Sequence, residues 1–339
     1  MPKPKKKTTI RDLAEAAETS VSTVSFVLNG TWKKHRTNPE TAERVLALAA
    51  KLGYQANQRA RALRLGRSSL AGMIIPHHRN RFFAGLVENF ETEARARGLV
   101  PIVVSTQRDP EIERQVAAKL VMQEVELLVV AGVENPSGIN RLCRNKGVRC
   151  VNVDLPGPDA FSVVTDNFGG ARDLTRRLLE DLAPTARAIF LGGREHEYAT
   201  DRRIEGFLAG MQENNRTAGN EDIVRCGYSP VAAREALSKL FDDTKSPPLA
   251  LLINSITTFE GFATFWRDRP DLAGNIRVAC FDWDPFAACL PVKSIMLRQD
   301  VENLIKVCFS WFDGEDERAG EVSVVPPRLI IDAPGPEYE

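Results

Sequence analysis

From Ser69 onward, short apolar runs alternate with amphipathic helical patterns through the rest of the chain. The apolar runs have the length of buried strands and lie at residues 70–75, 100–105, 127–131, 149–153, 188–191, 249–253, 277–281 and 294–297. Helical patterns fall between them, for example at residues 82–97 and 109–123. This alternation predicts an α/β body of doubly wound parallel sheets. Because there are many strands, we expect two subdomains with a ligand site between them, at the carboxyl ends of the strands.

The first 67 residues predict a small all-α unit instead. Thr9 and Asp12 have the spacing of a capping box at the start of a first helix, and Ser20 is placed to cap a second helix. A third helix is expected from Asn38 to about Leu52. The expected apolar faces are Ile10, Leu13, Ala14 and Ala17, then Val21, Val24, Val27 and Leu28, then Val45, Leu46, Leu48 and Ala49. Such a trio is typical of a helix-turn-helix unit, whose second helix reads base edges in DNA; a bundle without that role is the alternative.

Charge is distributed unevenly along a chain whose formal net charge is zero. Residues 1–67 carry 14 basic and 5 acidic side chains, a surplus of nine positive charges, so the remaining residues carry nine surplus negative charges. Such asymmetry indicates a polyanion-binding segment on an acidic body. Lys3 to Lys7 also fit a solubilising tail, whereas Arg59 to Arg67 lie within a helical pattern. Together with the polar outer face expected for the second helix, Ser22, Thr23, Ser25 and Phe26, this charge favours double-stranded DNA as the partner.

Sequence features of several other protein classes are absent. No apolar run approaches the roughly 20 residues needed to cross a bilayer, and the charged N-terminus lacks the apolar region of a secretory signal. The strand–helix turns carry no glycine-rich nucleotide motif and no G-x-S-x-G elbow, so neither a cofactor nor an enzymatic activity is expected. The six cysteines form no metal-binding pattern, and reduced, buried thiols in a cytoplasmic protein are expected. His77-His78 lack an acidic partner at metal-ligand spacing and fit a cleft wall or a solvated loop.

Four stretches of the first 67 residues carry a family resemblance: T-I-R-D-L-A from Thr9, V-S-T-V-S-F-V-L-N-G from Val21, E-T-A-E-R-V from Glu40, and L-G-Y-Q-A-N-Q-R-A-R-A-L-R-L-G-R from Leu52. They resemble the headpiece of the LacI/GalR (lactose-repressor) family of bacterial transcription regulators. The resemblance implies DNA contacts at Thr9, Val21, Ser22, Ser25, Phe26, Asn29, Asn57, Arg61 and Leu63.

Three departures from the family pattern bear on DNA recognition. Glu18-Thr19 stands where the turn usually has Gly-Val, so a non-glycine residue must serve there. Phe26 replaces the usual arginine, which removes a reader of guanine. Residues 31–37 form a loop that most members lack; this loop and the aromatic residue resemble the fructose-repressor (catabolite repressor/activator) branch. We therefore expect an operator unlike the common family site.

Residues 57–65 match the family's hinge helix. A helix this short is marginal alone, so we expect it to fold only on operator DNA. The resemblance implies that Leu63 wedges between base pairs in the minor groove and kinks the duplex. The alternative is an inert linker, although Ala60-Arg61-Ala62-Leu63 is more helix-prone than Gly/Ser linkers are.

The body resembles the same family's effector domain, which is similar to periplasmic sugar-binding proteins. The matching stretches are N-R-F-F-A-G-L from Asn80, V-V-T-D-N-F-G-G-A from Val163, R-I-E-G-F from Arg203, C-F-D from Cys280 and M-L-R-Q-D from Met296. The resemblance implies effector contacts at Phe82, Phe83, Asp154, Arg203, Ser255, Asp282 and Gln299. Aromatic faces pack sugar rings, arginine offers a planar fork, and carboxylates accept bonds from hydroxyls.

Each effector residue has a structural alternative. The phenylalanines also suit a helix core, Asp282 suits a turn cap before Pro285, and Arg202 competes with Arg203. Arg81 stands where proline is common and Leu155 where arginine is common. Arg81 suits a phosphate partner or an exposed surface position. The effector class is therefore a sugar or sugar phosphate first, and a nucleobase a distant second.

The resemblance implies a basic arm at residues 1–8, a DNA-binding headpiece at 9–56, a hinge at 57–68 and an effector and dimerisation domain at 69–339. Within that domain, we expect one subdomain at about 69–166 and 298–326 and the other at about 167–297 and 327–339. The implied function is that of a cytoplasmic, nucleoid-associated homodimeric repressor of a pseudo-palindromic operator. The region after Pro326 has no leucine heptads, so no coiled-coil tetramer is expected. A sugar-binding receptor and a nucleotide-dependent sugar enzyme are the alternatives.

Overall fold

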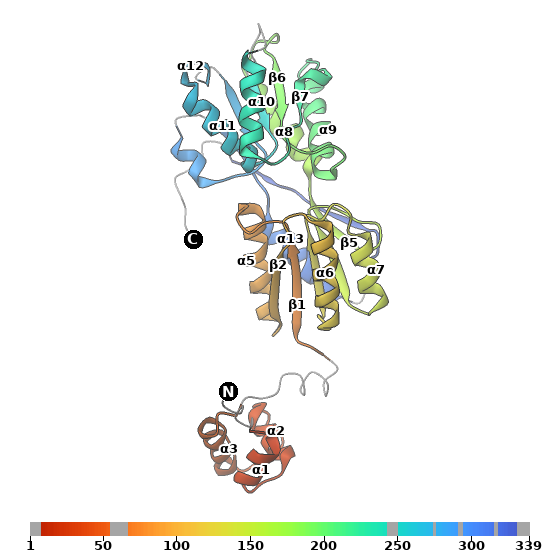
Figure 1. Cartoon of the computed structure of the whole chain (residues 1–339), viewed down its shortest axis with the longest axis vertical. Coiled ribbons are helices and arrows are strands. Elements are labelled where there is room, and N and C mark those ends of the chain that lie inside the picture. The colour runs from red at the N-terminus through yellow and green to blue at the C-terminus, as the bar shows by residue number, and fades with distance from the viewer. Residues whose placement is uncertain are drawn as a thin grey trace, which may run out of the picture. The chain divides into compact units, whose positions relative to one another are not determined.

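The computed structural model describes residues 8–54, 67–242, 250–273, 276–290, 294–314 and 318–330. The chain divides into two compact units, Met1–Ser68 and Ser69–Glu339, which are considered separately (Figure 1). No helix within the described ranges is long and apolar enough to cross a membrane.

The first unit contains three helices, α1 (Ile10–Ala16), α2 (Val21–Leu28) and α3 (Pro39–Lys51). Their start signals are confirmed: Thr9 and Asp12 form a reciprocal capping box, and the side chains of Ser20 and Asn38 cap α2 and α3. The core between the helices contains Leu13, Ala14, Ala17, Val24, Val27, Ala42, Val45 and Ala49. This arrangement is the expected helix-turn-helix with a closing third helix.

Two predicted core positions of this unit are wrong. Leu46 is 50% exposed, because it follows the buried Val45 by one residue and therefore lies about 100° around the helix from it. Val21, the first residue of α2, is 42% exposed. The turn between α1 and α2 places Glu18 in the left-handed region, at φ 48°, where glycine is the least strained residue.

The second unit contains two six-stranded sheets. The first has the order β11-β5-β4-β3-β1-β2, and all its strand pairs are parallel. Its strands are β1 (Leu70–Ile75), β2 (Val100–Ser105), β3 (Leu127–Ala131), β4 (Arg149–Val153), β5 (Phe161–Thr165) and β11 (Val322–Val325). Helices α5 (Arg81–Ala96) and α13 (Val301–Asp313) share one apolar core with this sheet. Helices α6 (Pro110–Met122) and α7 (Ser137–Asn145) share another, so both faces are covered.

The second sheet has the order β12-β10-β9-β8-β6-β7 and is parallel except for the antiparallel pair of β10 and β12. Its strands are β6 (Ala188–Leu191), β7 (Ile223–Val224), β8 (Ala250–Ile253), β9 (Arg277–Cys280), β10 (Ser294–Arg298) and β12 (Arg328–Ile330). One core contains α8 (Asn167–Leu179) and α9 (Tyr198–Glu213). The other contains α10 (Pro230–Asp242) and α11 (Ile256–Asp268). Short helices η1 (Asn220–Asp222), α12 (Pro270–Ala273) and η2 (Pro285–Cys289) complete the unit.

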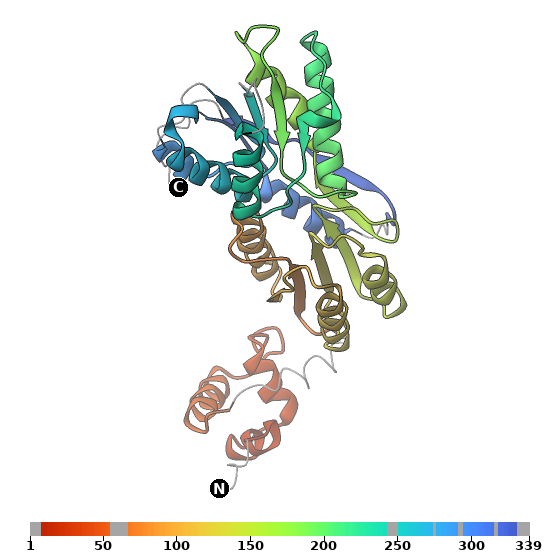
Figure 2. The same ribbon diagram turned by 45° about the horizontal axis from the view of Figure 1, so that its top comes forward.

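The chain passes between the two sheets three times, after β5, after β10 and after β11 (Figure 2). The predicted strands are present with ends within one residue of those expected, but β5, β7, β11 and β12 were not predicted. β7 has only two residues, and β11 and β12 are edge strands with exposed positions, so none of these three shows a long buried run. β5 is fully buried, and Ser162 interrupts its apolar run.

Helices α8 and α9 pack closely because glycines stand at their contact. A β-carbon on Gly206 would lie 2.3 Å from the backbone oxygen of Phe168, and one on Gly210 would lie 2.6 Å from the β-carbon of Thr175. Both distances are far shorter than any real contact, so only glycine permits this approach. The approach brings Arg203, one turn before Gly206 on α9, beside Asn167 at the start of α8.

Candidate functional site

The exposed face of α2 is the candidate nucleic-acid interface of the first unit. Val21 and Ser22 are exposed there, and Thr9 is exposed at the start of α1, where its hydroxyl accepts a hydrogen bond from the Asp12 amide. Phe26 is half-buried. Asn57, Arg61 and Leu63, the other expected DNA contacts of this region, lie outside the described residues.

Ser25 does not lie on the outer face, where it was expected. It is only 8% exposed on α2. The side-chain amide of Asn29 donates to the Ser25 carbonyl oxygen at 2.8 Å and to its hydroxyl at 3.2 Å. The side chains of Asn29 and Ser25 therefore interact at the end of α2.

The loop at residues 31–37 folds back onto α2. The ring of His35 stacks on Phe26 with centroids 3.6 Å apart and planes 7° from parallel. The Thr31 amide donates to the Phe26 carbonyl oxygen at 2.9 Å, which anchors the start of the loop. His35 was not predicted as a site residue, because its place depends on how the loop closes; the unusual aromatic residue at position 26 was the available signal.

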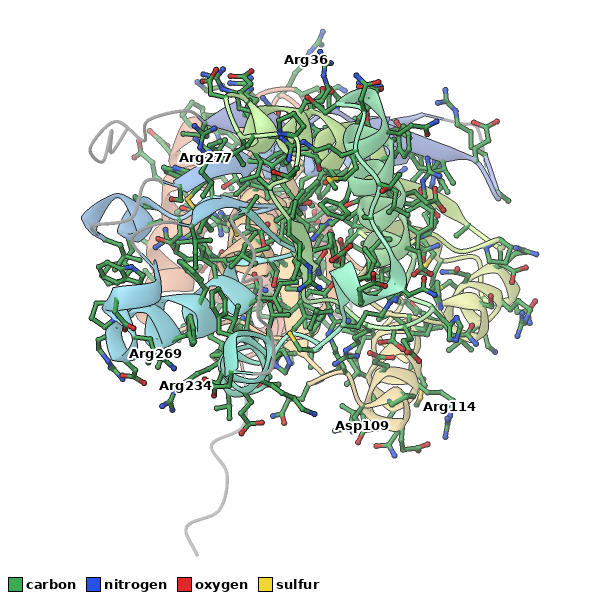
Figure 3. All side chains as sticks on the ribbon, turned by 90° about the horizontal axis from the view of Figure 1, so that it is seen from above. Arg36, Asp109, Arg114, Arg234, Arg269 and Arg277 are labelled. Atoms are coloured by element: carbon green, nitrogen blue, oxygen red, sulfur yellow. The ribbon has the colours of Figure 1, made fainter. Side chains whose placement is uncertain are left out.

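A cavity of about 620 Å³ lies in the second unit, between the two sheets at the carboxyl ends of their strands. All seven of the effector contacts expected from the sequence line it: Phe82, Phe83, Asp154, Arg203, Ser255, Asp282 and Gln299. Figure 3 shows charged side chains such as Arg114, Arg234 and Arg269 at the outside of the body, where water solvates them. Charges buried at a cavity wall lack that solvation and need specific partners.

Arg203 is buried at the cavity wall and hydrogen-bonded to two residues. It is 4% exposed, and its Nε donates to Oδ1 of Asn167 at 2.8 Å while Nη1 donates to the Asn254 carbonyl oxygen at 2.6 Å. Its guanidinium lies 3.8 Å from the ring centroid of Phe281. Arg202 pairs with Glu205 instead, and its side chain is 41% exposed. Of the two competing arginines, Arg203 is therefore the one that faces the cavity.

Asp282 lies at the cavity and is hydrogen-bonded to Gln299, which belongs to the segment that runs from β10 to α13. It is 7% exposed; its Oδ2 accepts from the Ile256 amide at 3.1 Å, and its Oδ1 accepts from Nε2 of Gln299 at 2.8 Å. Gln299 accepts in turn from the Thr165 hydroxyl at 2.6 Å. Burial raises the pKa of Asp282, and the Arg203 guanidinium opposes that rise. The turn before Pro285 is capped by Asp284, so the alternative role of Asp282 as its cap is wrong.

Asp154 lies on the opposite wall, directly after β4, in the left-handed region at φ 76°. Burial raises the pKa of this carboxyl to about 7, Arg203 opposes the rise, and Glu197 reinforces it. Phe82 is half-buried and lies edge-on to Phe83, with ring centroids 5.1 Å apart. Phe83 is only 3% exposed and belongs to the core of the first sheet, so its packing role is the larger one.

A polar cluster beside the cavity was not predicted. Glu197 is 3% exposed and accepts hydrogen bonds from the hydroxyls of Tyr228 and Thr200, the latter at 2.6 Å. Arg108, which follows β2, reaches it from the other subdomain with Nη1 3.8 Å from Oε1, and donates to the Gly132 carbonyl oxygen at 3.1 Å. The glycine-rich segment before Glu197 was a weak signal; nothing local marks Arg108.

Further ion pairs join the two subdomains at the cavity. Nε of Arg81 lies 2.6 Å from Oδ2 of Asp284, and Nη1 of Arg194 lies 2.6 Å from Oε1 of Glu134. Arg81 thus has an acidic partner in the chain itself, although its side chain is 57% exposed. Among the described residues, no cluster of His, Cys, Asp and Glu has the arrangement of a metal site.

Comparisons with known proteins agree over both units. Residues 9–57 match the family model described as bacterial regulatory proteins, lacI family, and residues 68–260 match that of periplasmic binding proteins and sugar binding domain of LacI family. The ribitol operon repressor of Klebsiella aerogenes is 44% identical over 193 residues, which are 56% of this chain and 72% of the relative. The sucrose operon repressor of Klebsiella pneumoniae is 29% identical over 305 residues, 90% of this chain and 91% of the relative.

Solved structures show the same fold at low sequence identity. The lac repressor dimer bound to operator and the anti-inducer ONPF has a TM-score of 0.81 at 19% identity, over 96% of this chain and 98% of that one. The Cra transcriptional dual regulator of Pseudomonas putida in complex with fructose 1-phosphate has a TM-score of 0.68 at 21% identity, over 78% of this chain and 98% of that one.

Proposed function

The chain belongs to the LacI family of bacterial regulatory proteins, which are DNA-binding transcription regulators and not enzymes, and we propose that it represses transcription as a homodimer on a pseudo-palindromic operator. A small sugar or sugar-phosphate effector in the cavity of the body controls its affinity for DNA. The relatives named for the ribitol and sucrose operons support a sugar-related signal.

One observation carries the effector part of this proposal: seven side chains from six separate parts of the sequence meet at a single cavity between two mainly parallel sheets. Such a position, at the carboxyl ends of strands, is where open α/β folds bind small molecules. Arg203 and Asp282 lie on one side of the cavity and Asp154 on the other, so a ligand held by all three would bridge the subdomains.

The proposed signal passes through the segments that connect the two sheets. Thr165 and Gln299 belong to two of these passages and are hydrogen-bonded to each other, and Gln299 holds Asp282. An effector that contacts Asp282 therefore acts on the segments that connect the two subdomains. The coupling between effector and DNA is expected to be about 1–3 kcal/mol, as in other allosteric proteins.

We propose the following organisation of the chain: a basic arm at 1–8, the headpiece at 9–56, the hinge at 57–68 and the effector and dimerisation domain at 69–339. The strand composition of the two sheets supports subdomains at about 69–166 with 298–326 and at about 167–297 with 327–339. Operator contacts are proposed for Thr9, Val21, Ser22, Ser25, Phe26, Asn29, Asn57, Arg61 and Leu63. The proposed location is the cytoplasm, on the nucleoid.

Electrophoretic mobility shift with the region upstream of the protein's own gene tests the DNA part of the proposal. A complex that survives a large excess of non-specific duplex at fixed salt is the expected result. Leu63→Ala should weaken this complex while the headpiece stays folded. Binding of a sugar without binding of any duplex would favour the receptor alternative.

A thermal-shift screen of sugars and sugar phosphates tests the effector part, because a ligand that binds only the folded state raises the melting temperature. Arg203→Ala should abolish the shift of the best compound. An undiminished shift would show that Arg203 is not the anchor.

A further inference from the structure

Positive charge gathers in the loop that follows α2. Residues 19–39, which include all of α2 and the loop at residues 31–37, contain no acidic side chain. Helix α2 itself contains no charged residue, whereas the loop carries Lys33, Lys34 and Arg36 within four positions. The formal charge of this stretch therefore lies entirely in the loop, next to an uncharged helix.

The loop is folded and packs against the helices of the headpiece. The ring of His35 stacks on that of Phe26 in α2 with centroids 3.6 Å apart, and Trp32 packs against the apolar core. The Thr37 amide donates to the Trp32 carbonyl oxygen at 3.0 Å, which closes the turn around His35. The three cations of the loop thus lie on a folded turn that is anchored at two rings.

None of these three cations has an acidic partner among the described residues. Lys33 lies over the ring of Trp32, with its ammonium nitrogen 5.4 Å from the ring centroid. The side chains of Lys34 and Arg36 are exposed and form no ion pair with the described part of the chain. Glu40, the next acid along the chain, lies in the first turn of α3 and does not pair with them. Like charges this close together repel one another, and a bound polyanion would relieve that repulsion.

The position of the loop suits the sugar-phosphate backbone of DNA. A recognition helix is about 10–12 Å across and the major groove is about 12 Å wide, so the helix fills the groove. A segment packed against the flank of that helix therefore meets the wall of the groove, where the phosphates lie. Lys34 and Arg36 are each one Cα step, about 3.8 Å, from His35, whose ring is stacked on α2.

From this charge and this placement we propose that Lys33, Lys34 and Arg36 form a phosphate clamp, which binds backbone phosphates of the duplex beside the bases that α2 reads. The inference rests on the proposed function and adds three residues to the operator contacts proposed there. Phosphate contacts fix the register and orientation of a protein on the duplex but carry no sequence information. The phosphate clamp thus contributes affinity and position, whereas the choice of bases stays with α2.

The salt dependence of DNA binding tests the phosphate clamp on the full-length protein. Lys34→Gln/Arg36→Asn removes two of its cations; asparagine suits position 36, because the residue there lies in the left-handed region at φ 53°. Each phosphate contact contributes about 0.9 to the slope of log Kobs against log salt concentration, so the double variant should lose about 1.8 of that slope for each headpiece bound. At about 100 mM salt its affinity should fall by about 10-fold or more.

Two duplexes separate phosphate contact from base contact. One is the region upstream of the protein's own gene, and the other is a shuffled sequence of the same length and composition. The double variant should lose affinity for both by the same factor, because the phosphates are the same in the two duplexes. Arg44→Gln/Lys51→Gln removes two exposed cations from α3 and is the matched control, which should keep the wild-type slope. The basic residues of the arm at 1–8 remain in every protein compared, so their contribution cancels.

Amide exchange in α2 at the wild-type rate checks that the variant headpiece is folded; if exchange is faster, Lys34→Gln alone is measured, with an expected loss of about 0.9 in slope. An unchanged slope in the folded loop variant would overturn the inference, and so would an equal fall in the α3 control. Loss of affinity for the upstream region alone would assign base contact to the loop and refute the phosphate clamp. A wild-type protein that binds neither duplex would refute the proposed function itself, and with it the inference.

Discussion

Replacing Arg203 by methionine should destabilise the body strongly, because this guanidinium is buried and serves several partners. Methionine fills much of the same volume but donates no hydrogen bond and carries no charge. Two hydrogen bonds from a charged donor are lost, to Asn167 and to the Asn254 carbonyl oxygen, each with a typical contribution of about 1.5–3 kcal/mol. Asp154 and Asp282 also lose the positive charge that opposes the rise in their pKa.

Removal of one member from a buried charged group usually costs about 3–5 kcal/mol of unfolding free energy, and we expect a loss in that range. For a body of this size, this corresponds to a fall in melting temperature on the order of 10 °C. Differential scanning calorimetry of the full-length protein at pH 7.5 measures it. Arg202→Met is the matched control: that side chain is 41% exposed and pairs with Glu205, so the change should cost about 1 kcal/mol or less.

The loss of unfolding free energy in Arg203→Met should also depend on pH. The pKa of Asp154 is about 7 in the folded protein, above its value in the unfolded chain, so its contribution favours folding at low pH and is lost as the pH rises through 7. Without Arg203 the folded pKa rises further, and the loss continues above pH 7. The difference in stability between wild type and Arg203→Met should therefore be smallest near pH 5 and widest above pH 8. Equal costs for the two arginine variants, or a difference independent of pH, would refute this reasoning.

Three further predictions concern single positions. Glu18→Gly should stabilise the headpiece by about 1 kcal/mol, seen as roughly fivefold slower amide exchange in α1, because the residue lies at φ 48°; faster exchange would contradict it. Phe26→Ala should weaken operator binding in a mobility-shift titration more than His35→Ala does, because the phenylalanine lies on the helix and the histidine only covers its ring; the reverse order would assign base contact to the loop. Gly206→Val should cost more than 3 kcal/mol in thermal unfolding, because its β-carbon would lie 2.3 Å from a backbone oxygen of α8; a near-native melting temperature would show that α8 and α9 separate easily.

Local signals explain what could be predicted from the sequence. Caps such as Thr9 with Asp12, and buried runs such as residues 127–131, need only their neighbours to be recognised, and they appear in the structure as expected. Errors of face arose where a helix turns by 100° per residue, as at Leu46 and Ser25. Two neighbouring apolar or small residues on a helix are of the same kind whether they face the core or the solvent. The sequence alone therefore does not tell which of the two points inward.

Contacts between distant segments were the part that the sequence could not supply. Arg108 and Glu197 meet because the turn after β2 faces the start of α9 across the cavity. Neither residue has a motif, and their pairing depends on the angle between two subdomains. The sequence identified the expected effector residues only through its resemblance to a family whose effector domain already has two subdomains around a ligand site.

The balance between the ion pairs at the cavity bears on how an effector could act. The pair of Arg81 and Asp284 and the pair of Arg194 and Glu134 join the subdomains, but each has an exposed member, and exposed pairs contribute little. These pairs connect the two subdomains but contribute too little free energy to fix the angle between them. A ligand shifts a conformational equilibrium only as far as it binds one state better than the other. Asp154 and Arg203 stand on opposite walls, Arg203 buried and Asp154 half-buried, so a molecule hydrogen-bonded to both gains that difference only when the cavity is closed.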